Sequence, residues 1–183
     1  VGSENVLLVD SGDWSSGTPE GLLDDGVAFV TAMVAVGYDA MCVGNHELDD
    51  GVAPFKRLVS ETQAPAVLAN VRDREGDRVD WAPPYRVFER AGLKMAVVGL
   101  LTQVTPSITH SDTKAVVFSD PALELAKVRE ELEVDSGTFP KLQLAKSINR
   151  AKTGDILLNS LRSDNTLTIL LADALLLLSQ VVQ

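Results

Sequence analysis

The sequence has little cysteine and no long hydrophobic run. Its 183 residues contain one cysteine, Cys42, which excludes a disulfide within the chain. Because Cys42 lies in an apolar run, we expect it to be a small core residue. The longest apolar segment, Leu167 to Leu178, is too short to span a bilayer and carries Asp173. We therefore expect a soluble chain without a membrane span.

Positive charge is also scarce. Sixteen Lys and Arg residues stand against 26 Asp and Glu residues, which gives a net charge of −10. This balance argues against a nucleic-acid polymer or an anionic membrane surface as the main partner. It does not exclude a phosphate substrate, because bound divalent cations would dominate the local field. The apolar content of 45% is enough for the core of one domain, or of one domain plus a fragment of another.

The most informative stretch is the polar turn at 44–51, which follows an apolar run at 40–43. We expect a strand to end there, and open α/β sheets bind their ligands at the carboxyl ends of their strands. Asn45 offers an amide oxygen, and His46 suits metal binding or general acid catalysis. Asp49 is placed to orient the imidazole. The alternative interpretation is a simple Gly-Asn turn with an exposed histidine.

The first fifty residues predict a strand, a helix and a second strand. Residues 6–9 are a short apolar run typical of a buried parallel strand, and 10–17 form a polar loop. The helix after this loop begins at Pro19 and ends at Gly37. Because both polar loops follow parallel strands, we expect them at one edge of the sheet, with Asp13 beside the second loop.

The rest of the chain is predicted to alternate in the same way as far as residue 133. We expect a helix over 51–63, a strand over 66–69, a hairpin of 85–89 with 93–101, and a helix over 121–132. Beyond residue 133 we expect an amphipathic helix over 142–151, a short strand over 156–158 and an apolar helix over 166–181. Such an apolar helix needs a partner surface, either the core or a second copy of the chain.

Two motifs lie in the two polar loops and the strand before the first of them. The first is Leu-Leu-Val-Asp-Ser-Gly-Asp at 7–13, and the second is Gly-Asn-His-Glu-Leu-Asp-Asp-Gly at 44–51. Together they resemble the motifs of the 5′-nucleotidase family of calcineurin-like metallophosphoesterases. A Gly-Asp loop followed about thirty residues later by Gly-Asn-His-Glu is a specific signature. Further similar stretches lie at 69–71, 97–100 and 118–121, so that the resemblance covers roughly residues 5–133.

The resemblance implies a fold class and a division of the chain. We expect an α/β fold, a layered metallophosphoesterase-like sandwich with a mixed, mostly parallel sheet and helices, present here in truncated form. Residues 1–133 would be a partial metallophosphoesterase domain. Residues 134–183 would be a divergent tail with an apolar C-terminal helix, and 162–176 resemble the start of the family's C-terminal domain.

The resemblance also implies residue roles. Asp13 matches the aspartate that bridges two divalent metal ions, and Asn45 matches the asparagine that binds one of them and contacts the substrate phosphate. His46 matches the histidine that meets the substrate and stabilises the transition state, and Asp49 matches the aspartate that orients it. The implied cofactors are two divalent ions (Mn, Zn, Mg or Ca), and the implied substrate is a small phosphate ester or nucleotide.

Other ligand positions of the family have no match in this sequence. The family has an Asp-x-His strand before its Gly-Asp loop and further histidines later, whereas this chain has only His46 and His110. We expect His110 at the surface. Asp13 and Asn45 are too few to hold two ions tightly, so we expect weak or no activity from this chain. Family members are often exported to the periplasm or cell exterior, but residues 1–5 lack the features of a signal peptide.

Three functions therefore remain open. The first is a metallophosphatase or nucleotidase. The second is a non-catalytic relative that keeps the scaffold and acts as an interaction or structural module. The third is a cyclic-nucleotide phosphodiesterase, because the fold does not fix the substrate. A metal titration separates the first two functions, and a panel of substrates separates the first from the third.

Overall fold

The structure is a computed structural model that describes residues 2, 5–14, 19–90, 92–109, 111–136, 141–146 and 166–171. Its centre is a parallel sheet of three short strands in the order β1-β2-β3. These strands are β1 (Val9–Asp10), β2 (Ala40–Cys42) and β3 (Ala66–Val67). Val9 pairs with Ala40, and Met41 pairs with Ala66. This is the parallel arrangement that the strand–helix–strand pattern predicts.

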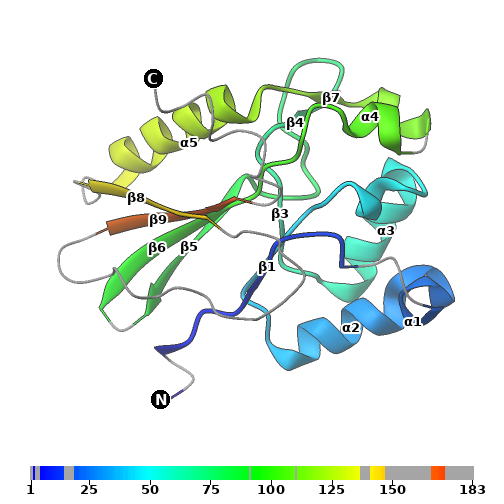
Figure 1. Ribbon diagram of the computed structural model, residues 1–183, viewed down its shortest axis with the longest axis horizontal. Helices are drawn as coiled ribbons and strands as arrows, with labels where there is room; N and C mark the ends of the chain where they lie inside the picture. The colour runs from blue at the N-terminus through cyan, green and yellow to red at the C-terminus, as the bar shows by residue number, and fades with distance from the viewer. Residues whose placement is uncertain are drawn as a thin grey trace.

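Helices cover one face of this sheet and a hairpin covers the other (Figure 1). The helices are α2 (Val27–Val36) and α3 (Val52–Thr62). The hairpin pairs β5 (Tyr85–Arg90) with β6 (Leu93–Val98) in antiparallel register, as predicted. Ala40 and Cys42 pack with Val97 on the hairpin side, whereas Met41 packs with Phe55 on the helix side. The strand β2 is apolar throughout because both of its faces are buried.

The other elements of the domain are short, apart from one long helix. This helix, α5 (Pro121–Ser136), begins after Asp120, whose carboxylate accepts the N–H of Ala122 at 2.8 Å and so caps it. The short elements are α1 (Pro19–Leu22), η2 (Leu23–Gly26), η3 (His46–Leu48), β4 (Val71–Arg72), α4 (Thr105–Ile108), η4 (Ser111–Ala115) and β7 (Val117–Phe118). Strands β4 and β7 pair in antiparallel register. Within the ranges given above, no helix has the length and apolar character needed to cross a membrane.

The helix predicted from Pro19 to Gly37 is interrupted in the structure. Asp24 and Asp25 have left-handed backbone angles, with φ of 49° and 55°, and α2 starts only after them. The Asp24 carboxylate accepts the N–H of Ala28 at 3.1 Å, so it caps α2 instead of continuing α1. The predicted end at Gly37 is confirmed, because its N–H bonds to the last turn at a φ of 95°.

The C-terminal helices were predicted wrongly where the structure describes them. Residues 141–146 and 166–171 form parallel strands, β8 (Lys141–Lys146) and β9 (Thr166–Leu171), and β9 lies against β6 (Figure 1). Polar and apolar residues alternate along 141–144 and 166–169, which is the period of a strand. The helix proposed for self-association is therefore absent over 166–171. The predicted strand at 156–158 and the rest of that helix lie outside the described residues.

Asn70 joins three segments that are far apart in the sequence. Its side chain is fully buried, and its amide nitrogen donates to the carbonyl oxygens of Leu101 at 2.7 Å and Ser119 at 2.9 Å. Its amide oxygen accepts the N–H of Leu101 at 2.8 Å. These bonds fasten the ends of β3, β6 and β7 around one side chain. They give a structural reason for the family-like residues at 69–71 and 118–121.

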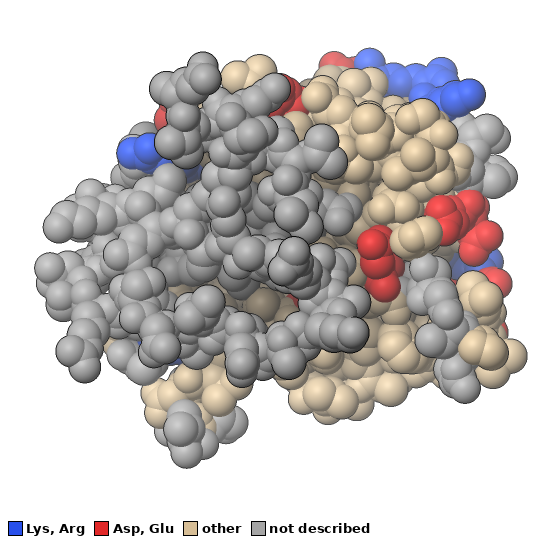
Figure 2. All heavy atoms as spheres, viewed as in Figure 1, with Lys and Arg blue, Asp and Glu red and all other residues tan. Residues whose placement is uncertain are grey.

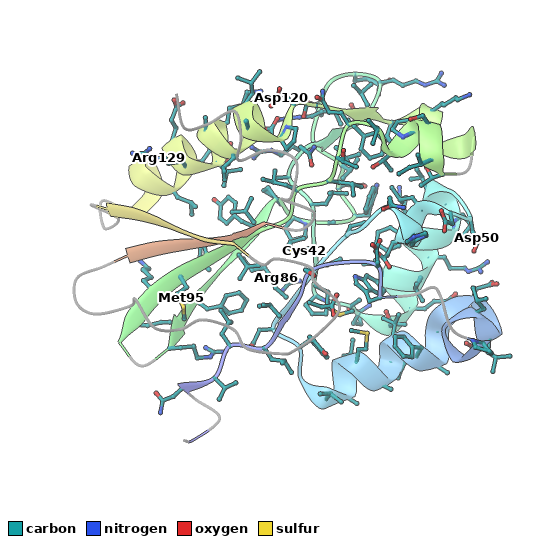
Figure 3. All side chains as sticks on the ribbon, in the orientation of Figure 1. Cys42, Asp50, Arg86, Met95, Asp120 and Arg129 are labelled. Atoms are coloured by element: carbon teal, nitrogen blue, oxygen red, sulfur yellow. The ribbon has the colours of Figure 1, made fainter. Side chains whose placement is uncertain are left out.

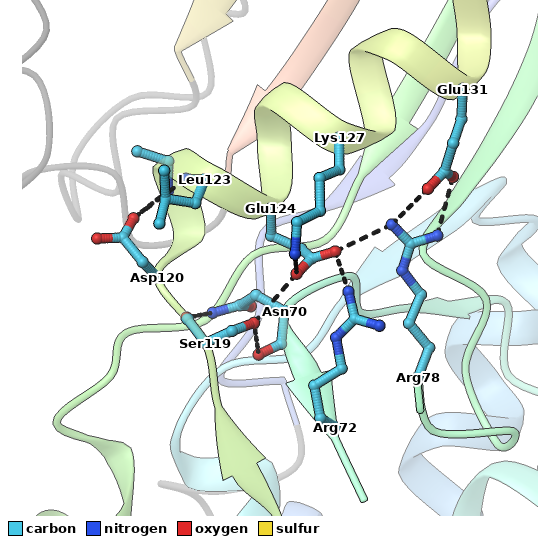
Figure 4. Close-up of polar contacts among 10 residues, drawn as sticks. Asn70, Arg72, Arg78, Ser119, Asp120, Leu123, Glu124, Lys127 and Glu131 are labelled. Atoms are coloured by element: carbon cyan, nitrogen blue, oxygen red, sulfur yellow. Dashed lines mark hydrogen bonds and ion pairs between the residues drawn. The ribbon is translucent and has the colours of Figure 1, made fainter. Parts of the chain in front are cut away.

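Glu124 is a buried carboxylate that ties α5 to the segment after β3 (Figure 4). Arg72 donates to its Oε1 atom, and Arg78 donates to the same oxygen at 3.0 Å. The hydroxyl of Ser119 donates to Oε2 at 3.2 Å. Burial alone would raise the pKa of Glu124, but the hydrogen bonds from Arg72 and Arg78 outweigh burial and lower the pKa to about 2.

We expect acid to destabilise the chain through Glu124. Its folded-state pKa lies below the ordinary value of 4.5, so the ionised side chain stabilises the fold above about pH 4.5. This contribution, roughly 3 kcal/mol, is lost as the pH falls toward 2. Urea unfolding between about pH 2 and pH 6 measures it. Glu124→Gln should be less stable than the wild type near pH 6, and its free energy of unfolding should fall less than that of the wild type as the pH is lowered.

The exposed Glu130 on the same helix provides the control for this experiment. Glu130→Gln should keep the acid dependence of the wild type, because the Glu130 side chain is exposed, whereas Arg72 and Arg78 hold the Glu124 carboxylate. If Glu124→Gln lost as much stability in acid as the wild type does, the acid sensitivity would have to come from other carboxylates.

Candidate functional site

The two polar loops of the sequence meet at the carboxyl edge of the parallel sheet. One loop follows β1 and carries Asp13, and the other follows β2 and carries residues 44–51. The backbone N–H of His46 donates to Oδ1 of Asp13 at 3.2 Å. The predicted juxtaposition of Asp13 with the second loop is therefore confirmed. Figure 3 shows Cys42 in the middle of the molecule and Asp50 on the turn that leads into α3.

The two loops touch backbone to backbone, and glycine is required on both sides. A Cβ atom on Gly12 would lie 2.6 Å from the nitrogen of Gly44, and the φ of Gly12 is +107°. A Cβ atom on Gly44 would lie 2.2 Å from Oδ1 of Asp13. Both distances are shorter than real Cβ contacts allow. The glycines of the two motifs are explained by this close approach, which the separate motifs could not reveal.

Glu47 is the residue that the sequence analysis missed. It is only 5% exposed, and its Oε2 atom accepts the N–H of Asp13 at 2.8 Å and the N–H of Gly44 at 2.7 Å. One carboxylate oxygen thus joins the loop after β1 to the loop after β2. In the sequence, the sign of this role was the position of the glutamate inside the Gly-Asn-His-Glu motif, directly before Leu48, which is buried.

His46 and Asp49 form a pair at the surface of the site. Nδ1 of His46 lies 2.7 Å from Oδ2 of Asp49, and the side chains are 50% and 42% exposed. The hydrogen bond with Asp49 raises the pKa of His46 against a smaller effect of burial, and the charges of Asp13 and Glu47 add to the rise. The imidazole is thereby oriented and favours its protonated form. This form can donate a hydrogen bond to an anionic group such as phosphate.

Asn45 begins the turn η3, where its backbone carbonyl accepts the N–H of Leu48 at 3.1 Å.

The loop after β1 is attached to β2 by Trp14, whose indole N–H donates to the carbonyl of Cys42 at 2.8 Å. The carboxylate of Asp10 accepts the N–H of Gly12 at 2.9 Å. Burial and the charge of Asp13 raise the pKa of Asp10 against the effect of that bond. These bonds hold the backbone of the loop that carries Asp13.

The donors present do not complete a metal site. Within the described part of the chain, no three side chains of His, Cys, Asp and Glu gather so that they could hold an ion. Asp13 and Asn45 offer one carboxylate and one neutral amide, which are hard oxygen donors suited to divalent cations but too few for two of them. Cys42 does not add a ligand, because burial raises the pKa of its thiol to about 12. Its predicted role as a core residue is confirmed, and His110 lies outside the described residues.

Curated proteins of related sequence include several 5′-nucleotidases. The 5′-nucleotidase of Vibrio cholerae is 36% identical over 131 residues, which are 70% of this chain and 23% of that protein. The solved structure of a 5′-nucleotidase precursor from Thermus thermophilus matches with a TM-score of 0.65 and 31% identity. That match covers 73% of this chain and 26% of the other. This chain belongs to the 5′-nucleotidase family.

The predicted fold class of this 5′-nucleotidase relative is confirmed as well. The calcineurin-like phosphoesterase YfkN of Bacillus subtilis matches with a TM-score of 0.60 over 87% of this chain and 52% of that one. At 20% identity, this likeness concerns the fold alone. None of the protein-family models matches the chain. The chain spans about a quarter of the length of the curated relatives that it matches.

Replacement of Gly44 should separate the two loops of the site. In Gly44→Ala, the new methyl group would overlap the Asp13 carboxylate, so we expect a loss of roughly 1–3 kcal/mol and an altered amide environment at His46. Gly76→Ala is the control, because nothing lies within 4 Å of its Cβ position and its cost is limited to a left-handed backbone. Urea unfolding and ¹H–¹⁵N spectra measure both effects. If the amide signal of His46 had the same position in Gly44→Ala and in the wild type, the close approach of Gly44 to Asp13 would be contradicted.

Proposed function

We propose that these loops provide part of the active site of a metal-dependent phosphoric monoester hydrolase of the 5′-nucleotidase type. The observation that supports this proposal is the contact between the Asp13 carboxylate and the Asn45–Asp49 turn at the carboxyl edge of a parallel sheet. Ligand sites of open α/β sheets lie at that edge. The family resemblance assigns Asp13 and Asn45 to metal, Asn45 and His46 to the phosphate, and Asp49 to the orientation of His46.

In this proposal Asp13 and Asn45 are oxygen ligands to divalent metal ions. Members of the calcineurin-like and 5′-nucleotidase families generally use such ions, and two ions of Mn, Zn, Mg or Ca are expected for this type. When bound, they would polarise the phosphate and lower the pKa of water. Because the described donors are too few to hold two ions, we propose that hydrolysis by this chain alone is weak or absent.

His46 acts on the substrate directly in this proposal, and Asp49 acts through His46. Asp49 accepts the hydrogen bond of Nδ1 and fixes the ring, and the protonated imidazole donates a hydrogen bond to a phosphate oxygen. Positive charge on the ring would stabilise the negative charge that develops on the phosphoryl group. Asn45, the preceding residue, carries a neutral amide, which suits a contact with the same phosphate.

The negative charge at the site favours binding of a cation first and of a phosphate only afterwards. Asp13 and Glu47 act on His46 by their charges, and Asp13 also acts on Asp10, so several carboxylates share this small region. On the face seen in Figure 2, acidic side chains gather over the region of α1 and α3. A free phosphate would be repelled by such a field, whereas a divalent cation would be attracted and would invert the local charge.

We expect slow, metal-dependent hydrolysis at best when the chain is mixed with Mn²⁺ and a chromogenic phosphate monoester. The affinity for Mn²⁺ should be no tighter than about 1 mM, because hydration competes with two protein donors. Asp13→Ala should abolish residual turnover together with Mn²⁺ binding. His46→Ala should reduce turnover more than binding. Initial rates give the turnover, and Mn²⁺-induced broadening of amide signals gives the binding.

Asp80→Ala provides the control for these measurements, because the Asp80 side chain is 90% exposed and pairs only loosely with Lys56. It should leave both readouts unchanged. Hydrolysis that survives both Asp13→Ala and His46→Ala would contradict the assigned site. Mn²⁺ binding that depends on Asp13 without any turnover would favour the non-catalytic relative. Selective hydrolysis of cyclic diesters would favour a phosphodiesterase.

A further inference from the structure

The carboxylate of Glu47 lies between the two loops that carry the proposed metal and phosphate residues. One of its oxygens, Oε2, accepts the N–H groups of Asp13 and Gly44 at 2.8 and 2.7 Å. The first of these bonds joins residues that are 34 positions apart. Because the carboxylate is buried, both hydrogen bonds form at low local dielectric, where charge-assisted bonds are strong.

Asp13 depends on this partner because its backbone is left-handed. Its φ of 60° is unfavourable for a residue with a Cβ atom, so its surroundings must maintain the conformation. Glu47 holds the Asp13 N–H, and the Asp13 carboxylate in turn accepts the N–H of His46 at 3.2 Å. The chain of contacts runs from Glu47 through Asp13 to His46. The position of the candidate metal ligand is thus set by a side chain that is not itself a ligand.

We propose that Glu47 is the positioning residue of this site. It fixes the Asp13 carboxylate relative to Asn45 and His46 before metal or phosphate binds. The identity of what Asp13 and Asn45 bind rests on the proposed function. The positioning itself is a property of the metal-free chain and can be measured there.

Two substitutions separate the geometry of Glu47 from its charge. Glu47→Gln removes the charge but keeps an acceptor oxygen at the same distance from the backbone. Glu47→Asp keeps the charge but shortens the side chain by one methylene group, so that its oxygen no longer reaches both N–H groups. If Glu47 acts by its position, the glutamine variant retains the loop arrangement and the aspartate variant loses it.

Amide hydrogen exchange of the metal-free chain is the measurement. In Glu47→Asp, exchange should rise about tenfold or more at Asp13, Gly44 and His46, which is the factor expected for loss of a hydrogen bond to a charged group. His46 is the decisive position, because its N–H bonds to Asp13 and not to Glu47. Glu47→Gln keeps the acceptor but makes weaker, neutral hydrogen bonds, so exchange should rise by no more than about fivefold and clearly less than in Glu47→Asp. The matched control is Glu61→Asp, which shortens a half-exposed glutamate on α3. It should leave the exchange rates at Asp13, Gly44 and His46 unchanged.

Wild-type exchange at His46 in Glu47→Asp would overturn the proposal, and so would equal losses in both variants. If Glu47→Asp also raised exchange at Met41 in β2, the rise at His46 would have to exceed the rise at Met41, and equal rises at the two positions would overturn the proposal as well. Added Mn²⁺ tests the proposed function separately. Broadening at Asp13 and Asn45 in the wild type, weakened in Glu47→Asp, supports both proposals. No broadening in the wild type removes the metal site, while the exchange data still test Glu47.

Discussion

Two backbone N–H groups point at one carboxylate oxygen of Glu47, and the geometry of the site depends on this arrangement. The donors come from Asp13 and Gly44, which follow neighbouring strands of the parallel sheet. Side chains larger than glycine at positions 12 and 44 would force these donors apart. The Gly-Asp and Gly-Asn-His-Glu motifs are therefore two halves of one contact. Their residues are needed together, because either loop alone leaves a buried donor or acceptor without its partner.

The surrounding fold supplies the rigidity that this contact needs. The strand β2 is buried on both faces, so its register against β1 determines which residues face each other at the loop ends. Trp14 bonds to the carbonyl of Cys42 and packs against the ring of Phe55, which fastens the first loop to β2 and α3. Asn70 and Glu124 fasten the following segments in the same manner, through buried polar side chains whose bonds reach distant parts of the chain.

The sequence allowed the elements of the βαβ unit, the hairpin and the place of Asp13 beside the second loop to be predicted, because these follow from local periodicity and strand direction. It did not predict the break at Asp24, since the capping of Ala28 competes with helix continuation only in the folded arrangement. The strand at 166–171 was predicted as a helix because its alternation covers only 166–169 and passes into a continuous apolar run, which also fits a buried helix. Glu47 was missed because its role arises from contacts across 34 residues.

Order in the loops and the number of ligands affect metal binding in different ways. Loops that are fixed before binding spare the ion the entropic cost of arranging its ligands, and Glu47 reduces that cost at Asp13. The binding enthalpy still depends on how many anionic donors replace water, and within the described part of the chain no three His, Cys, Asp or Glu side chains gather so that they could hold an ion. Preorganisation cannot substitute for missing donors. We therefore expect the position of an ion to be well defined at this site even where its affinity is low.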